Sequence, residues 1–318
     1  MGKNSSRDIE GIPTGLRGEV TNIDISICIV TFKAREYLRE CLRSIEDNTR
    51  RSQYEVIVVD NGSQDGTIEF LEDEHPKVVI LRNEVNAGFT RPMNQALKIS
   101  SGRYLLQLNP DTDVLPDALD KLVAFMDEHT EVGICGPKVL NRDHTLQKSC
   151  RRGESRPLAV ISHFLGLAKL FPGEKIFGEY QLTYMNEDET HRVAGVAGSC
   201  MLIRREVIDQ IGYLDERFFA YQEDADFCFR AREAGWKVYY YPKAQIIHYG
   251  GQGGSRVHPY RSIYEWHRSY WLYYRKNLAK DYFFLFNWFY YAMMLIKLVI
   301  TLLLSAIRSE KFAGPRRG

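Results

Sequence analysis

The first segment whose residue types could do chemistry is 60–67 (DNGSQDGT), which follows a short apolar run. Its side chains, above all those of Asp60 and Asn61, can hydrogen-bond the ribose or the base of a nucleotide. The same residue types also form an ordinary turn followed by a helix N-cap, so both interpretations stay open. Neither G-x-x-x-x-G-K-[ST] nor a strand-linked G-x-G-x-x-G occurs in the sequence, which disfavours a kinase or a dehydrogenase.

A second acidic segment, 109–113 (NPDTD), places Asp111 and Asp113 two residues apart after another apolar run. Carboxylate oxygens are the ligands that Mg²⁺ and Mn²⁺ prefer, and Mg²⁺ needs only one or two of them when phosphates and water complete its coordination. The segment therefore suits a divalent metal that also binds a diphosphate. The structural alternative is a solvated acidic loop.

A third acidic segment, 218–227 (FFAYQEDADF), sets three carboxylates among aromatic and apolar residues. Such surroundings raise the pKa of a carboxyl group and suit it to proton abstraction. We expect Asp224 to be the base. Asp226 has a structural alternative, because it can cap the following helix and pair with Arg230 four residues on.

His248 lies between an apolar run and the glycine-rich segment 249–255 (YGGQGGS). A lone histidine is more often structural than a ligand. Glycines, however, let a backbone approach phosphates closely, and such a loop can close over a ligand. We therefore expect His248 to take part in binding a metal or a diphosphate.

These segments follow strands of a predicted α/β fold. Apolar, β-branched runs predict buried parallel strands, and helical spacing of apolar residues predicts helices between them. The expected strands are 25–31, 55–60, 78–81 and 104–108, and the expected helices lie around 37–45 and 93–99. Because ligands bind beyond the carboxyl ends of the strands in open α/β sheets, the polar segments should converge on one rim.

Composition agrees with a folded protein of one large or two smaller domains. The 318 residues carry a net charge of +1, with 44% hydrophobic and 26% charged residues, which disfavours intrinsic disorder and bulk DNA binding. The six cysteines are far apart and form no C-x-x-C pair, so neither a zinc site nor a disulfide framework is expected. This number and spacing of cysteines fits a protein from a reducing compartment.

We expect three parts in the chain. Residues 1–22 are polar and glycine-rich and are predicted to be a flexible segment without a signal peptide, which favours a start in the cytosol. Residues 23–255 are predicted to form the catalytic domain. Residues 256–318 differ in kind, because basic, aromatic and then apolar residues dominate there.

The C-terminal region is predicted to associate with a membrane. Between 256 and 280, six Lys or Arg residues face one Glu and are interleaved with tyrosine and tryptophan, a pattern that single-stranded nucleic-acid binding would also explain. The 25 residues 283–307 that follow have very few polar groups and favour a membrane instead. No nucleic-acid partner is expected.

The apolar segment has a narrow polar stripe, formed on a helical wheel by Asn287, Lys297, Thr301 and Ser305. Such a helix can lie in the membrane interface or pack its stripe against the catalytic domain. Basic residues on both flanks favour an in-plane or re-entrant helix over a single span. A buried core helix is the third interpretation.

Taken in order, the motifs resemble family 2 glycosyltransferases of the GT-A fold, and most closely a rhamnosyltransferase-like branch. The resemblance covers about Ile25 to Ser255. It rests on 29–32 (IVTF), 58–63 (VVDNGS), 86–89 (NAGF) with Asn94, 108–111 (LNPD), 212–219 (GYLDERFF), 223–230 (EDADFCFR), 235–236 (GW) and His248.

The resemblance implies a fold and a set of site residues. The fold would be a Rossmann-like, mostly parallel sheet flanked by helices, followed by a C-terminal membrane-associating helical region. The donor nucleotide sugar would be bound by Thr31, Asp60, Asn61, Gly88, Arg91, Asn94 and Asp111. A divalent metal, Mg²⁺ or Mn²⁺, would be bound by Asp111, His248 and Asp113. Asp224 would be the catalytic base, and Glu223, Tyr221 and Trp236 would lie on the acceptor side.

Asn109 stands where the family's D-x-D signature has its first acid, so Asp111 would be the principal metal ligand. The implied activity is inverting transfer of a sugar, with dTDP-rhamnose as the expected donor, in the synthesis of a cell-surface polysaccharide or cell wall. The acceptor would be a polyprenyl-diphosphate-linked glycan at the cytoplasmic face of the membrane. Another donor, a UDP-hexose or a GDP-sugar, and a non-catalytic nucleotide-sugar-binding scaffold remain alternatives.

Overall fold

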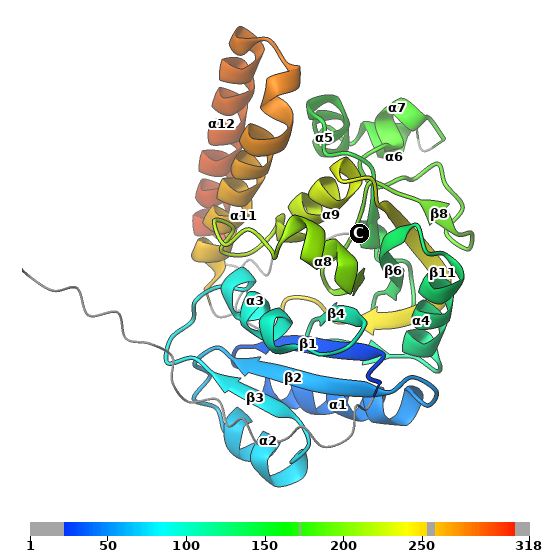
Figure 1. Cartoon of the computed structure of the whole chain (residues 1–318). Helices are drawn as coiled ribbons and strands as arrows, with labels where there is room; N and C mark the ends of the chain where they lie inside the picture. Colours follow the sequence, from blue (N-terminus) through cyan, green and yellow to red (C-terminus); the bar gives the residue numbers. More distant parts are fainter. Residues whose placement is uncertain (1–21, 172, 253–257, 309–318) are drawn as a thin grey trace, which may run out of the picture.

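The computed structural model describes residues 22–171, 173–252 and 258–308. In this part of the chain a nine-stranded sheet has the order β3-β2-β1-β4-β10-β6-β11-β5, with β8 paired to β11 (Figure 1). Its strands are β1 (Ile25–Thr31), β2 (Tyr54–Asp60), β3 (Val79–Arg82), β4 (Tyr104–Leu108), β5 (Thr112–Val114), β6 (Val132–Leu140), β8 (His191–Arg192), β10 (Cys200–Arg204) and β11 (Lys237–His248). A separate two-stranded sheet pairs β7 (Arg151–Arg152) with β9 (Gly195–Val196).

The first half of the sheet is the parallel unit that the sequence predicts. Strands β3, β2, β1 and β4 are parallel neighbours, and the register pairs Thr31 with Asp60 at their carboxyl ends. The second half is mixed, because β10 runs antiparallel to both β4 and β6, while β11 runs parallel to β6 and antiparallel to β5. The α/β fold is thus confirmed: six of the nine strands run in one direction, and β5, β8 and β10 run against them.

Helices cover both faces of this sheet (Figure 1). The predicted helices are observed as α1 and α3, each longer than its apolar pattern. The helices of the catalytic part are α1 (Arg35–Asn48), α2 (Thr67–Glu74), α3 (Thr90–Ile99), α4 (Ala118–Glu128), α5 (Pro157–Phe164), α6 (Leu167–Leu170), α7 (Lys175–Gly178), α8 (Arg205–Ile211) and α9 (Glu223–Glu233).

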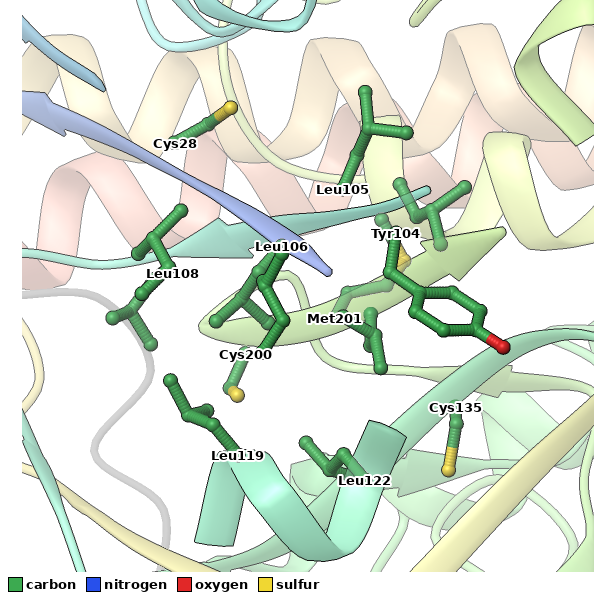
Figure 2. Close-up of a cluster of buried hydrophobic side chains, with 14 of the residues drawn as sticks. Cys28, Tyr104, Leu105, Leu106, Leu108, Leu119, Leu122, Cys135, Cys200 and Met201 are labelled. Carbon is green, nitrogen blue, oxygen red and sulfur yellow. The ribbon is translucent and has the colours of Figure 1, made fainter. Parts of the chain in front are cut away.

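The main core fills the space between the sheet and its helices. Figure 2 shows Leu106 and Leu108 of β4 beside Cys200 and Met201 of β10, above Leu119 of α4. All six cysteines are buried and unpaired, as the sequence predicts. Burial raises the pKa values of their thiols, for example to about 11 for Cys150 and to about 12 for Cys41, which argues against a nucleophilic cysteine.

The C-terminal region forms a helical hairpin beside α9 and α5 (Figure 1). Helix α11 (Pro259–Tyr273) passes through a π-helical turn and a short 3-10 turn into α12 (Phe284–Arg308). Within the described residues, α12 is the helix long and apolar enough to cross a membrane. Almost all of the predicted flexible segment 1–22, and the predicted boundary at 255/256, lie outside the described residues.

Candidate functional site

A cavity of about 990 Å³ opens at the carboxyl ends of the strands. Seven of the residues singled out from the sequence line it: Asn61, Gly88, Asp111, Tyr221, Glu223, Asp224 and His248. They come from segments that are up to 187 positions apart in the chain, from Asn61 to His248. The convergence expected from the sheet topology is therefore observed.

The carboxyl ends of β1 and β2 lie next to the cavity, because the chain neighbours Val30, Phe32 and Asn61 line it. Thr31 and Asp60 are buried partners in the parallel ladder, and the Oγ1 atom of Thr31 and the Oδ1 atom of Asp60 have no hydrogen-bond partner. The other carboxylate oxygen of Asp60 accepts the backbone N–H of Ser63 at 3.1 Å. Two buried oxygens thus remain able to accept or exchange hydrogen bonds next to the cavity.

Asn61 holds the loop that precedes α3. Its Nδ2 donates to the carbonyl of Gly88 at 2.6 Å, and its Oδ1 accepts the N–H of Ala87 at 3.1 Å. Gly88 has φ +91°, and a Cβ atom there would overlap the carbonyl oxygen of Phe219. Only glycine allows both this conformation and this approach, so Gly88 and Asn61 shape the cavity wall.

Asp111 and His248 meet at one end of the cavity. Strand β5 pairs with the end of β11, with Thr112 opposite His248, and the Nε2 atom of His248 lies 3.2 Å from Oδ1 of Asp111. Burial alone would raise the pKa of Asp111. The charge of His248 and hydrogen bonds from His248 and the N–H of Gln252 outweigh it, so the pKa lies below its ordinary value.

The arrangement at His248 fits a divalent cation. Its Nδ1 lies 2.9 Å from Oε1 of Gln147, which can accept a proton only from Nδ1–H. A cation between Nε2 and Oδ1 of Asp111 would replace the proton that Nε2 donates to Asp111, and the hydrogen bond from Nδ1–H to Gln147 is the outer contact typical of metal-bound histidine. Within residues 22–171, 173–252 and 258–308, no group of three or more His, Cys, Asp or Glu side chains is gathered for a metal. Phosphate and water would have to complete the coordination, as Mg²⁺ permits.

Asp224 lies in the opposite wall and is held by three donors. Its Oδ2 accepts Nη2 of Arg152 and the N–H of Gly198, the latter at 2.8 Å, and its Oδ1 accepts the N–H of Ala225 at 2.7 Å. Burial alone would lower the pKa of Arg152, but the charge of Asp224 raises it above its ordinary value. A permanently charged guanidinium is therefore paired with this carboxylate.

Glu223 is the neighbouring carboxyl group at the start of α9. Burial, and then the charge of Asp224, raise the pKa of Glu223 to about 8, and its Oε2 is buried without a hydrogen-bond partner. Tyr221 and Gln222, just before it, have φ +68° and +64°, a conformation that non-glycine residues rarely adopt. The two carboxyl groups thus differ: Asp224 is paired with a guanidinium, and Glu223 has no such partner and keeps its proton at neutral pH.

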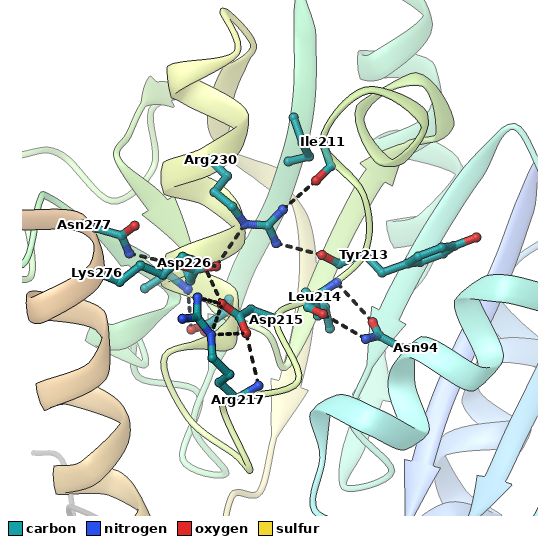
Figure 3. Close-up of polar contacts among 12 residues, drawn as sticks. Asn94, Ile211, Tyr213, Leu214, Asp215, Arg217, Asp226, Arg230, Lys276 and Asn277 are labelled. Carbon is teal, nitrogen blue, oxygen red and sulfur yellow. Dashed lines mark hydrogen bonds and ion pairs between the residues drawn. The ribbon is translucent and has the colours of Figure 1, made fainter. Parts of the chain in front are cut away.

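Besides Thr31 and Asp60, which lie next to the cavity, four predicted residues do not line it. Arg91 is exposed and pairs with Glu216 at 3.3 Å, and Asn94 exchanges two hydrogen bonds with the backbone of Leu214, as Figure 3 shows. Asp113 is the middle residue of β5, between the buried Thr112 and Val114. Its carboxyl group is hydrogen-bonded to Ser44 of α1, so it does not reach the cavity that Asp111, which precedes the strand, lines.

Trp236 is the fourth of these residues, and it is placed at the opposite end of β11 from His248. Its Nε1 donates to Gln210 of α8 at 2.7 Å. Between them β11 runs beside eight residue steps of β6, from Val132 to Leu140, which is about 26 Å, so Trp236 does not lie on the acceptor side of the cavity.

Asp226, the third carboxylate of the acidic segment, is structural. It is completely buried and contacts Arg230 at 3.0 Å, Lys276 at 2.7 Å and Asn277 at 2.9 Å (Figure 3). The pairing with Arg230 is the one that the spacing of four residues predicts. Through Lys276 and Asn277, the same carboxylate attaches the C-terminal hairpin to α9.

The sequence interpretation missed Gln147, Arg152 and the contribution of α11. Arg152 stands in an Arg-Arg pair, a signal too common to indicate a buried partner, and its role appears only through its contact with Asp224. The wall opposite the sheet comes from the C-terminal hairpin. It is formed by His258, Arg261, Ser262, Glu265 and Trp266.

Comparisons with known proteins agree with this geometry. The profile of Glycosyl transferase family 2 matches residues 26–212, and that of Glycosyl transferase family group 2 matches residues 177–309. The chain is 27% identical to the N-acetylglucosaminyl-diphospho-decaprenol L-rhamnosyltransferase of Mycobacterium tuberculosis, over 73% of this chain and 78% of that protein. It is 29% identical to the low-salt glycan biosynthesis hexosyltransferase Agl10 of Haloferax volcanii, over 66% of this chain and 62% of that protein.

Solved structures share the fold at low identity. TarS 1–349 of S. aureus, in complex with UDP-GlcNAc, is similar with a TM-score of 0.56 and 19% identity, covering 79% of this chain and 65% of that one. GalNAc-T7 with UDP, GalNAc and Mn²⁺ is similar with a TM-score of 0.53 and 17% identity, covering 73% of this chain and 44% of that one. With more than half of its length matched by the family profile and the expected GT-A architecture in place, the chain belongs to glycosyltransferase family 2.

Proposed function

We propose that this glycosyltransferase moves L-rhamnose from dTDP-rhamnose, with inversion, to a hydroxyl group of a polyprenyl-diphosphate-linked glycan. The reaction would take place at the cytoplasmic face of the membrane, in the synthesis of a cell wall or surface polysaccharide. The observation that carries the proposal is that one cavity is lined both by Asp111 and His248 and by Glu223 and Asp224.

The donor nucleotide would lie against the ends of β1 and β2. The unpartnered oxygens of Thr31 and Asp60 supply hydrogen-bonding capacity there, and the loop fixed by Asn61 and Gly88 forms the adjacent wall. The donor diphosphate would then point toward Asp111 and His248. Arg91 and Asn94 contribute only indirectly in this arrangement, because they support the segment around Leu214 and Glu216.

A divalent metal, Mg²⁺ or Mn²⁺, would be bound by Asp111 and His248. When bound, it would stabilise the negative charge that develops on the departing diphosphate. Gln147 orients the imidazole ring through Nδ1, and Asn109, whose Nδ2 lies 3.2 Å from Nε2 of His248, can reorient its amide oxygen toward the same position.

Asp224 would take the proton from the acceptor hydroxyl as its oxygen attacks the anomeric carbon. The new C–O bond forms on one face of the sugar while the bond to the diphosphate breaks on the other, so a single displacement inverts the configuration. Arg152 holds the carboxylate of Asp224 in place, and Glu223, protonated at neutral pH, adds no second negative charge beside it.

A lipid-linked acceptor is supported by the wall that α11 contributes. Arg261 and His258 line the cavity on the side of the hairpin that carries the apolar helix α12, so a diphosphate anchored in a membrane could reach the cavity from that side. The name of the Mycobacterium tuberculosis relative specifies a diphospho-decaprenol acceptor and L-rhamnose. These two observations are the basis for the proposed acceptor and sugar.

The test is transfer by the full-length, membrane-bound protein across dTDP-rhamnose, UDP-hexoses and GDP-sugars, with Mg²⁺ or Mn²⁺ and a polyprenyl-diphosphate-linked N-acetylglucosamine acceptor. Release of dTDP with formation of a glycosylated lipid, lost in Asp224→Asn and kept in the exposed control Asp209→Asn, supports the proposal. Transfer from another donor alone would contradict rhamnose. Donor binding without transfer to any acceptor would indicate a non-catalytic scaffold.

A further inference from the structure

A cluster of exposed apolar side chains lies outside the C-terminal region, on the segment that carries α5, α6 and α7. Its members are between 44% and 70% exposed. They are Leu158, Phe164, Leu165, Leu170, Phe171 and Ile176, and we call them the α5–α7 patch. Soluble monomers rarely expose so many large apolar side chains within one short segment, so the patch needs an occupant.

The patch continues directly into the C-terminal hairpin. The ring of Phe164, at the end of α5, contacts that of Trp266 of α11 edge-on at 6.0 Å. Lys297 of α12 places its Nζ 3.7 Å from the centroid of Phe164 and 4.1 Å from that of Trp266. Ala159 and Val160 of α5 share a core with Tyr270 and Tyr290 of the hairpin.

Helix α12 presents a second apolar surface. One stripe, from Leu285 through Trp288, Leu295 and Val299 to Leu303, is exposed along the helix. The single charged residue of 284–307, Lys297, is turned to the opposite side and covered by two aromatic rings. The charge is thus removed from the face that carries the apolar stripe.

The polar stripe of α12 packs along α11, the helix that lines the cavity, and along the turn that follows α11. Asn287 accepts the hydroxyl of Tyr274, the hydroxyl groups of Tyr290 and Tyr270 are 2.8 Å apart, and Ser305 is buried. From residue 287 to residue 305 a helix rises about 27 Å, close to the thickness of the hydrocarbon core of a bilayer. A helix attached over that length cannot cross the bilayer while the folded domain stays outside it.

We propose that the α5–α7 patch is a second membrane-contacting surface, and that it and the exposed stripe of α12 rest together on one leaflet, with α12 in the plane of the membrane. The proposal rests on the proposed function, which places the protein at a membrane. It commits to a lipid bilayer as the occupant. Continuity with α12 favours a bilayer, as do the exposed Lys169 and Lys175 within the patch, which suit anionic headgroups.

The consequence for the site is a defined route for the acceptor. Two connections join the cavity to the patch. Arg152, which lines the cavity, is followed along the chain by the short segment 153–156 and then by α5. Trp266 of α11 both lines the cavity and contacts Phe164 of the patch. With both surfaces on the membrane, the cavity would open beside the headgroup layer between α5 and α11. A membrane-anchored diphosphate could then enter without leaving the leaflet.

Fluorophore labelling of the full-length chain tests the contact. Because the six native cysteines are buried, Leu165→Cys and Leu170→Cys can each be labelled selectively with a polarity-sensitive dye. Ile300→Cys on α12 is the reference, and Ile99→Cys, an exposed apolar position on α3, is the matched control. Each protein is added to vesicles of phosphatidylcholine and phosphatidylglycerol, with and without nitroxide-labelled lipid.

We expect a blue shift, several-fold brighter emission and nitroxide quenching at positions 165, 170 and 300, and none at 99. Quenching at 300 alone would overturn the second surface and leave the membrane-bound enzyme standing. No quenching at any position would contradict membrane association itself. Dye shifts that depend on protein concentration without vesicles would assign the patch to a second copy of the chain and overturn the proposal.

A paired substitution separates this role from folding. Leu165→Glu with Leu170→Glu should lower partitioning to vesicles about tenfold, because charges replace apolar groups at the interface. Release of nucleoside diphosphate from the soluble donor should stay unchanged, since neither side chain lines the cavity. Unchanged partitioning together with unchanged release would contradict the contact.

Discussion

The two ends of the cavity use the same pairing, a buried carboxylate against a cation, for different purposes. At one end Asp111 faces His248 at 3.2 Å, and at the other Asp224 is paired with Arg152. An imidazole nitrogen can bind either a proton or a metal ion, whereas a guanidinium has no free lone pair and stays charged. In the first pair a metal ion can therefore take the place of the proton, and the second keeps its charge fixed.

The two ends also differ in how the fold positions them. Asp111 and His248 are placed by neighbouring strands, because β5 pairs with the end of β11. Asp224 lies at the start of α9, after two residues in the left-handed conformation, and Arg152 comes from the separate two-stranded sheet. The end that would bind metal is built on the main sheet, and the end that would move a proton is built on elements added to it.

The largest effect on activity is expected for the pair of Asp224 and Arg152. Asp224→Asn removes the proposed base, and we expect kcat to fall about a thousandfold with the donor dissociation constant unchanged. The measurement is single-turnover transfer combined with calorimetric donor binding. A fall of less than tenfold, or a larger fall in Glu223→Gln, would move the base to Glu223.

A smaller loss of transfer activity is expected for the pair of Asp111 and His248. Removal of divalent metal with EDTA, or Asp111→Asn, should lower transfer about a hundredfold, because the charge on the leaving diphosphate loses its stabilisation. Asp113→Asn is the control, since its side chain faces α1. Full activity in EDTA would contradict a metal at this end, and equal losses in both variants would contradict the assignment to Asp111.

The third prediction concerns Glu223 and the pH dependence of stability. Its folded-state pKa is raised from 4.5 to about 8. Its contribution to the free energy of unfolding is therefore complete below pH 4.5 and is lost as the pH rises through about 8. Within that window the free energy of unfolding should fall by up to about 1.4 kcal/mol per pH unit. In Glu223→Gln, the free energy of unfolding measured with urea should change less between pH 5 and about pH 8 than in the unsubstituted protein.

The matched control for that experiment is Glu206→Gln, an exposed glutamate of α8. It should leave the pH profile of unfolding as in the unsubstituted protein. A Glu223→Gln profile parallel to that of the unsubstituted protein would show that Glu223 does not keep its proton in the folded state, and would remove the contrast between the two carboxyl groups.

The smallest effect tests a residue that supports the cavity from outside. Asn94→Ala leaves the buried N–H and carbonyl of Leu214 without their partners, so we expect stability to fall by about 1 to 3 kcal/mol. The KM for the donor should change little, because Asn94 does not line the cavity. A large rise in KM at unchanged stability would instead assign nucleotide binding to Asn94.

Much of this fold is readable from local patterns. The runs that became β1, β2 and β4 are apolar on both faces because both faces of the sheet are covered, and the polar residues that end them mark the rim. The pairing of Asp226 with Arg230 follows from helical spacing alone. Asp111, Asp224 and His248 could be found because each stands directly beside such an element.

The sequence by itself therefore determined the α/β fold, the rim and the polar segments that line it, since periodicity and strand ends are properties of neighbouring residues. Tertiary structure alone decided the partners. It paired Asp224 with Arg152 over 72 positions, turned Asp113 away from the cavity, separated Trp236 from His248 by the length of β11, and brought α11 over the site. Such contacts depend on strand register, side-chain alternation and the packing of distant segments, which no local pattern encodes.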